Sequence, residues 1–332
     1  MMVLVTGASS SGKSAFAEKC LMDMGEKTRI YAATMIAWDE ECRERIRRHR
    51  AMRKEKKFET IECPVDLETL TIPEKSAVLL ECMSNLAANE LYREDMDAGA
   101  DISVRCPKAE ERILMGLYEI KSQAEDFVVV TNEVFSDGGI YDRETKGYQR
   151  LLGRLNRELF CMADEAWEVV MGIPVCLKGE EKAACRRDDK GVHMKLIVGG
   201  VHQGKKKAAL KILGRETETE PGAVADGERD SFEAALKGKL VLNFHEYIRR
   251  FSSMEPEDAR SKMHLFLEQL KEENPGVTVV SDEIGCGIVP VDREDRLWRD
   301  LLGEALRDLA GESDEVYRVI CGCIQTLKGG IK

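Results

Sequence analysis

The chain has 332 residues, of which 43% are hydrophobic and 33% charged, a composition typical of a folded protein long enough for two domains. Its net charge of −11 gives no general attraction to polyanions, so we expect no nucleic-acid partner. No apolar run approaches the roughly 18 residues of a membrane span and no signal peptide is recognisable, so we expect no integral membrane segment and a cytoplasmic protein.

The first predicted strand, at 3–6, contains the apolar run Val3–Val5 and leads directly into a glycine-rich loop. The loop fits the phosphate-binding pattern G-x-x-x-x-G-K-[ST], with a helix expected after it. Backbone N–H groups of such a loop surround phosphate oxygens, its lysine reaches the β- and γ-phosphates, and its final hydroxyl can ligate Mg²⁺. The predicted nucleotide-binding residues here are Gly7, Ala8, Ser9, Ser10, Ser11, Gly12, Lys13 and Ser14, with Ser14 also the predicted Mg²⁺ ligand.

Further apolar runs alternate with helix-like segments as far as residue 179. Two helices are predicted from their periodicity, at 110–124 and 148–162. The other strands expected in this region are 28–32, 76–80, 127–131 and 166–171. The pattern predicts an α/β fold like that of phosphate-loop nucleoside triphosphatases, with a mostly parallel sheet covered by helices on both faces.

The pattern then begins again after a polar segment. A strand at 194–198 is followed by Gly199 to Lys206, a second G-x-x-x-x-G-K sequence. Residues 129–179 also align without gaps to residues 279–329, with 18 of the 51 positions identical. We therefore predict a tandem duplication: a catalytic domain at 1–179, a linker at 180–193, and a degenerate repeat of the same α/β unit at 194–332.

The second repeat has lost residues that phosphate chemistry needs. Lys206 stands where Ser14 stands in the first, which puts positive charge at the expected metal position. The expected counterpart of Glu81 is Asn243, which is not a carboxylate, and the shorter distance from the loop lysine shows that about 30 residues are missing from the middle. We expect the second half to be non-catalytic.

The segment missing from the second repeat is strongly basic in the first. On a helix, Arg45, His49 and Arg53 share one face, and arginines bind phosphate through two hydrogen bonds. Neighbouring cations favour a neutral imidazole, which could attack phosphorus. From composition alone a solvated helix face is the favoured explanation of the basic segment, whereas a nucleic-acid patch lacks aromatic residues to stack on bases.

Two carboxylates, Glu81 and Glu133, stand at the ends of predicted strands. Glu81 ends the run at 78–80, where a residue that orients Mg²⁺ or acts as a base belongs, although an acid at a helix N-terminus is the alternative interpretation. Glu62 could contact ribose or base, but carries little weight alone. Asn132 and Glu133 end another strand at the same edge of the sheet.

The order and spacing of the sequence motifs resemble one known family. They are VLVTGASSSGKS at the loop, YAAT at 31–34, RIRRHRAMR at 45–53, ETIE at 59–62, LLEC at 79–82 and VVVTNEV at 128–134. GRLNREL and ADEAWEVVMGIPVCLKG continue the resemblance to residue 179. The chain resembles adenosylcobinamide kinase / adenosylcobinamide-phosphate guanylyltransferase, the bifunctional enzyme of cobalamin nucleotide-loop assembly.

The resemblance implies a function. ATP or GTP phosphorylates adenosylcobinamide; GTP then guanylylates a histidine, and adenosylcobinamide phosphate takes the GMP to give adenosylcobinamide-GDP. The implied catalytic residues are His49, Lys13 and Glu81, with Mg²⁺ as the metal. Besides the loop, the implied nucleotide contacts are Thr34, Met35, Ile36, Arg50, Ala51, Met52, Arg53, Glu62 and Glu81.

The chain also departs from the family. The family pattern G-x-G-I-V-P is replaced in the first half by residues 135–140 and is retained in the second half at 285–290. Family members are single units that form trimers, and an appended unit can replace a neighbouring subunit. A homo-oligomer and a pseudo-oligomer through the duplicated half therefore both stay open, as do two other functions: a plain small-molecule kinase and a nucleotide-regulated corrinoid-binding protein.

Overall fold

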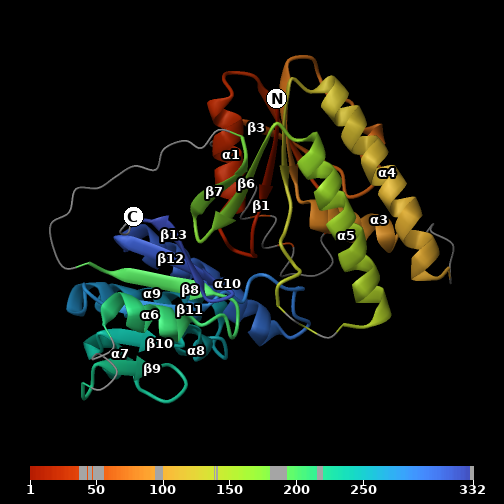
Figure 1. Ribbon diagram of the computed structural model, residues 1–332. Helices are drawn as coiled ribbons and strands as arrows, with labels where there is room; N and C mark the ends of the chain where they lie inside the picture. The colour runs from red at the N-terminus through yellow and green to blue at the C-terminus, as the bar shows by residue number, and fades with distance from the viewer. Residues whose placement is uncertain are drawn as a thin grey trace.

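The computed structural model describes residues 1–36, 43, 47, 56–93, 100–137, 139, 141–179, 193–214 and 220–329 (Figure 1). The elements form two sheets. The first half contains β1 (Met2–Thr6), α1 (Lys13–Asp23), β2 (Thr28–Ala33), β3 (Phe58–Glu62), the short 3-10 helix η1 (Leu67–Thr69), β4 (Ser76–Glu81), α3 (Met83–Leu91), α4 (Ile102–Gln123), β5 (Asp126–Val130), α5 (Arg143–Met162), β6 (Glu165–Val170) and β7 (Ile173–Lys178).

The second half repeats the succession in shorter form. It contains β8 (Lys195–Gly199), α6 (Lys205–Leu213), β9 (Val224–Asp226), α7 (Phe232–Lys237), β10 (Leu240–Leu242), α8 (Phe244–Arg249), α9 (Pro256–Glu273), β11 (Thr278–Asp282), α10 (Arg293–Glu312), β12 (Glu315–Ile320) and β13 (Cys323–Lys328). The expected α/β fold with two mostly parallel, helix-covered sheets is confirmed.

The two sheets have the same strand order. The first runs β3-β2-β4-β5-β1-β6-β7, and the second, in the same direction, runs β9-β10-β11-β8-β12-β13. In each sheet the last two strands form an antiparallel hairpin, and the others are parallel. Within the described residues, the second sheet has no counterpart of β3.

Alternation along the strands explains how helices cover both faces. In β1, Met2 and Leu4 point into a core shared with α3, α4 and α5, whereas Val3 and Val5 pack against α1. The second sheet is covered in the same way, with α6 on one face and α7 to α10 on the other. Runs of consecutive apolar residues are the expected signature of strands buried on both sides.

Two helices begin earlier than the sequence periodicity predicts. Helix α5 starts at Arg143 because the Asp142 carboxylate caps it, accepting a hydrogen bond from the Thr145 N–H at 2.8 Å. Helix α4 starts at Ile102 and contains Pro107. Because proline is normally unfavourable inside a helix, the sequence did not indicate a helix over this first part.

The two halves pack together through the turn that joins β6 and β7. Val170 and Met171 at this turn are 1% and 4% exposed, and they belong to the hydrophobic core of the second half, beside residues of α10. Figure 1 shows α10 passing under the first half at this point. No helix in the described part of the chain is long and apolar enough to span a bilayer.

Candidate active site

The predicted phosphate loop connects β1 to α1 at the carboxyl edge of the first sheet. Gly12 caps α1 with φ +92°, a left-handed conformation that favours glycine, and Lys13 is the first helical residue. The Lys13 side chain is buried, and its Nζ donates to the Ala8 carbonyl at 3.0 Å. The helix N-terminus, the lysine and the turn therefore have the arrangement that binds phosphate.

Ser14 and Glu81 meet beside the loop. The Ser14 hydroxyl donates to Glu81 Oε1 at 2.5 Å, and the Tyr31 hydroxyl donates to Glu81 Oε2. A hydroxyl and a carboxylate are the hard oxygen ligands that Mg²⁺ prefers, so the donor set fits this ion. The sequence predicted Ser14 and Glu81 as site residues but not Tyr31, although Tyr31 belongs to the YAAT motif and lies on the strand next to β4.

Thr34 has a mainly internal set of contacts. It is fully buried, and its Oγ1 donates to the Cys82 carbonyl at 3.0 Å and accepts from the Cys82 N–H at 2.7 Å. These bonds join the ends of β2 and β4 and so hold Glu81 in place. Met35 and Ile36, which follow, are half-buried.

The remaining predicted nucleotide contacts fall on the next segment. His49, Arg50, Ala51, Met52 and Arg53 lie outside the described residues. Glu62 is exposed at the end of the edge strand β3.

In the second glycine-rich loop, the lysine pairs with a carboxylate of its own half. Strand register makes Asp282 the counterpart of Asn132, and Lys205 Nζ lies 2.5 Å from Asp282 Oδ1 and 2.7 Å from the Gly200 carbonyl. The carboxylate therefore competes with any phosphate for Lys205. Both groups are largely buried, which strengthens their attraction.

Strand register also corrects one comparison between the repeats. Glu81 pairs with Val130 on β5, and the matching position on β10 is Leu242 rather than Asn243. Asn243 instead donates to Asp226 Oδ1 at 2.9 Å. The second half thus has an apolar side chain where the first has its carboxylate, and Lys206 in place of Ser14.

A charged cluster joins the halves near the candidate site. Arg318 makes two hydrogen bonds to Glu168, at 2.9 and 3.0 Å, and lies 3.6 Å from Glu283. Burial raises the pKa of Glu283 above its ordinary value, against the opposing effect of Arg318. Burial acts to lower the pKa of Arg318, but the carboxylates of Glu283 and Glu168 outweigh it and the pKa is raised.

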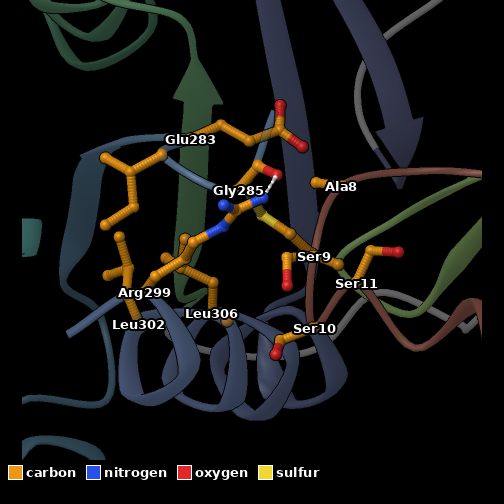
Figure 2. Close-up of a pocket in the computed structure, with 12 residues that line it drawn as sticks. Ala8, Ser9, Ser10, Ser11, Glu283, Gly285, Arg299, Leu302 and Leu306 are labelled. Atoms are coloured by element: carbon orange, nitrogen blue, oxygen red, sulfur yellow. Dashed lines mark hydrogen bonds between the residues drawn. The ribbon is translucent and has the colours of Figure 1, made fainter. Parts of the chain in front are cut away.

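The second half also reaches the phosphate loop, which agrees with the expectation that the appended unit takes the place of a neighbouring subunit, although the sequence did not predict which residues make the contact. A cavity of about 20 Å³ between them is lined by Ala8 to Ser11 on one side and by residues of the β11–α10 region on the other (Figure 2). The only sequence signal was the Gly-x-Gly-Ile-Val-Pro pattern retained at 285–290.

Comparison with known proteins identifies the family of the chain. The family described as cobinamide kinase / cobinamide phosphate guanyltransferase matches residues 3–177 and 238–327. The bifunctional adenosylcobalamin biosynthesis protein CobU of Salmonella typhimurium is 32% identical over 184 residues, which is 54% of this chain and 100% of that protein. The protein of the same name from Escherichia coli is 33% identical over 186 residues, again 54% of this chain and all of the relative. Because the family match covers both halves and most of the sequence, the chain belongs to the cobinamide kinase / cobinamide phosphate guanyltransferase family.

Proposed function

We propose that the chain phosphorylates adenosylcobinamide and then transfers GMP from GTP to adenosylcobinamide phosphate, giving adenosylcobinamide-GDP in cobalamin biosynthesis. The observation that carries the proposal is the hydrogen bond of 2.5 Å between Ser14 Oγ and Glu81 Oε1, beside Lys13 at the start of α1. Catalysis is assigned to residues 1–179, with 180–193 as linker and 194–332 as a non-catalytic repeat. The proposed compartment is the cytoplasm.

In the first reaction, the loop N–H groups and Lys13 bind the nucleoside triphosphate, either ATP or GTP, and offset charge on the phosphoryl group. Ser14 and Glu81 would hold Mg²⁺, and the ion would supply positive charge that offsets the negative charge of the phosphate groups. Tyr31 fixes the Glu81 carboxylate by hydrogen bonding to its second oxygen. The oxygen of the corrinoid hydroxyl bonds to the γ-phosphorus and releases its proton to water, while the bond from the γ-phosphorus to the bridging oxygen breaks and the nucleoside diphosphate leaves.

In the second reaction, His49 is the proposed nucleophile. An imidazole nitrogen bonds to the α-phosphorus of GTP and pyrophosphate leaves; a phosphate oxygen of adenosylcobinamide phosphate then bonds to the same phosphorus and frees the histidine. Arg50 and Arg53 are proposed to offset phosphate charge, with Thr34 to Ile36, Ala51, Met52 and Glu62 forming the rest of the nucleotide site.

The residues that flank the basic segment support this placement. On its N-terminal side, the Thr34 N–H donates to the Glu81 carbonyl at 3.1 Å. On its C-terminal side, Lys56 Nζ makes an ion pair with Glu18 of α1. The segment that carries His49 therefore leaves and rejoins the described structure next to the helix of the phosphate loop.

The test is incubation with α-labelled GTP and separately with adenosylcobinamide plus nucleotide, with products resolved by mass. We expect an acid-labile label on the wild-type protein, none on His49→Ala, and an unchanged label on His202→Ala, which removes a histidine from the second loop. Kinase activity of His49→Ala should persist. Corrinoid phosphate without any labelled protein would indicate a plain kinase, and GTP binding without corrinoid turnover would indicate a regulatory binding protein.

A further inference from the structure

Two hydrogen bonds connect the second half to the phosphate loop of the first. The Ser9 N–H donates to the Gly285 carbonyl at 2.9 Å, and the Ser10 hydroxyl donates to Asp300 Oδ1 at 3.0 Å. Gly285 lies in the segment between β11 and α10, and Asp300 lies on α10. Figure 2 shows Ser9 and Ser10 facing these two elements.

Arg299 holds the segment that receives Ser9. Its guanidinium is buried, and it donates to the carbonyls of Gly285, Gly287 and Ile288 at 2.6, 2.8 and 2.9 Å. One cation therefore fixes three carbonyl groups within the four-residue segment 285–288, and hydrogen bonds to a charged donor are stronger than neutral ones. The Gly285 carbonyl, drawn with its bond to Arg299 in Figure 2, is thus presented to the loop in a defined orientation.

The contact is too close for side chains at two positions. A Cβ on Gly303 would lie 2.4 Å from the Ser10 Cβ, and one on Gly285 would lie 2.9 Å from the Ala8 Cβ and from the Ser9 carbonyl oxygen. The cavity that remains, about 20 Å³, is about the space of one water molecule. The loop therefore cannot shift toward the second half.

The first half does not have an equivalent surface. At the offset of 150 residues that relates the repeats, Phe135 replaces Gly285 and Arg150 replaces Asp300. Gly153, the counterpart of Gly303, is retained, but a Cβ there would lie 3.7 Å from the Phe135 ring. The half that lost its own phosphate chemistry is the one that keeps the surface for a phosphate loop.

We propose that Gly285, Arg299 and Asp300 are positioning residues of the second half that hold the phosphate loop of the first in the conformation that binds nucleoside triphosphate. Ser10 has φ +55°, a strained conformation for a residue other than glycine, and Asp300 anchors its side chain. His202 in the second loop has φ +60°, so the turn forms in both repeats; what the contact adds is restriction of its motion. A loop held before binding loses less conformational entropy on binding.

The inference rests on the proposed function only in placing the nucleotide at this loop. The test uses the full chain and measures the Kd of a non-hydrolysable GTP analogue by calorimetry, together with KM and kcat for both substrates. We expect Asp300→Ala to raise the Kd and KM for nucleotide about three- to tenfold, the range for the net contribution of one ordinary hydrogen bond, with the KM for corrinoid unchanged. Asp300→Asn keeps an acceptor and should restore most of the affinity.

A variant of Ser10, the hydrogen-bond partner of Asp300, and a control variant elsewhere on α10 complete the test. Ser10→Ala should weaken nucleotide binding by a similar factor, and the double variant should be no worse than either single one, because both remove the same bond. Asp308→Ala, also on α10 but paired with Lys271 at 2.8 Å, should bind like the wild type.

Wild-type affinity in Asp300→Ala, or independent and additive losses in the double variant, would overturn the inference. These results are distinguishable from failure of the proposed function, which would leave the wild-type chain binding nucleotide but forming no corrinoid product. If Asp300→Ala is less stable than the wild type, Ser10→Ala alone decides the question from the other side of the bond.

Discussion

Replacing Arg318 by leucine tests whether the charged cluster holds the two halves together. Arg318 and Glu168 have side chains 15% and 18% exposed, and Glu283, the third member, is 8% exposed. Removing the cation leaves two largely buried carboxylates unpaired, and such losses typically cost about 3–5 kcal/mol. Because the cluster is not fully buried, we take about 3 kcal/mol, which corresponds to a fall in Tm of roughly 6–12 °C for domains of this size.

The assay is thermal unfolding of Arg318→Leu and wild type between pH 5 and pH 8. The deficit should shrink as the pH falls, because burial raises the pKa of Glu283 and the arginine opposes that rise; without the arginine this carboxyl takes up a proton more readily, and a neutral carboxyl is cheaper to bury. Arg293→Leu is the control: its pair with Glu255 is 66% and 77% exposed, and its Tm should stay within about 2 °C of the wild type. An equal effect of both variants, or a deficit that does not depend on pH, would refute the reasoning.

Three other predictions concern single sites. Burial raises the pKa of Glu283 in the folded protein above its unfolded value of about 4.5. The folded state therefore binds the proton more tightly, and this favourable contribution to stability is lost as the pH rises from about 4.5 through the higher folded pKa. Glu283→Gln should flatten the pH dependence of Tm above about pH 4.5, and an unchanged slope would contradict this. Calorimetry should find one bound nucleotide per chain, because the Asp282 carboxylate pairs with Lys205 in the second loop. Two equal sites would show that the second loop also binds nucleotide. Ser14→Ala should lower the kinase kcat about 10- to 100-fold and raise the Mg²⁺ requirement, and an activity with the wild-type Mg²⁺ dependence would remove Ser14 from the metal site.

Strands buried on both faces were the easiest elements to predict. The expected strands at 3–6, 28–32, 76–80, 127–131, 166–171 and 194–198 all exist, within one residue at each end. Their short runs of consecutive apolar residues are typical of strands buried on both faces and fit few other elements of secondary structure. The edge strand β3 alternates poorly between buried and exposed residues, and β9 and β10 have three residues each, so neither periodicity nor length distinguishes them in the sequence.

The candidate site was predictable where one local motif carries it. The spacing of Gly7 to Ser14 defines the loop, and Glu81 follows from its position at the end of a strand. Tyr31 was missed because its contact with Glu81 depends on the neighbouring order of β2 and β4. The approach of Gly285 and Asp300 to the loop depends on how two repeats pack, which local sequence patterns do not encode.

The two repeats have diverged in complementary ways. In the second, Asp282 neutralises Lys205 and Leu242 replaces the carboxylate, so its loop is unsuited to phosphate. In the first, Phe135 lies against Gly153, at the surface that in the second half receives a phosphate loop. Each repeat thus keeps one side of a single head-to-tail contact and has lost the other. Contacts of this type form rings or open chains when every unit keeps both sides. In the proposed arrangement, loss of one side in each repeat leaves one nucleotide loop and one surface that supports it, and Gly285, Arg299 and Gly303 of the proposed non-catalytic repeat belong to that surface.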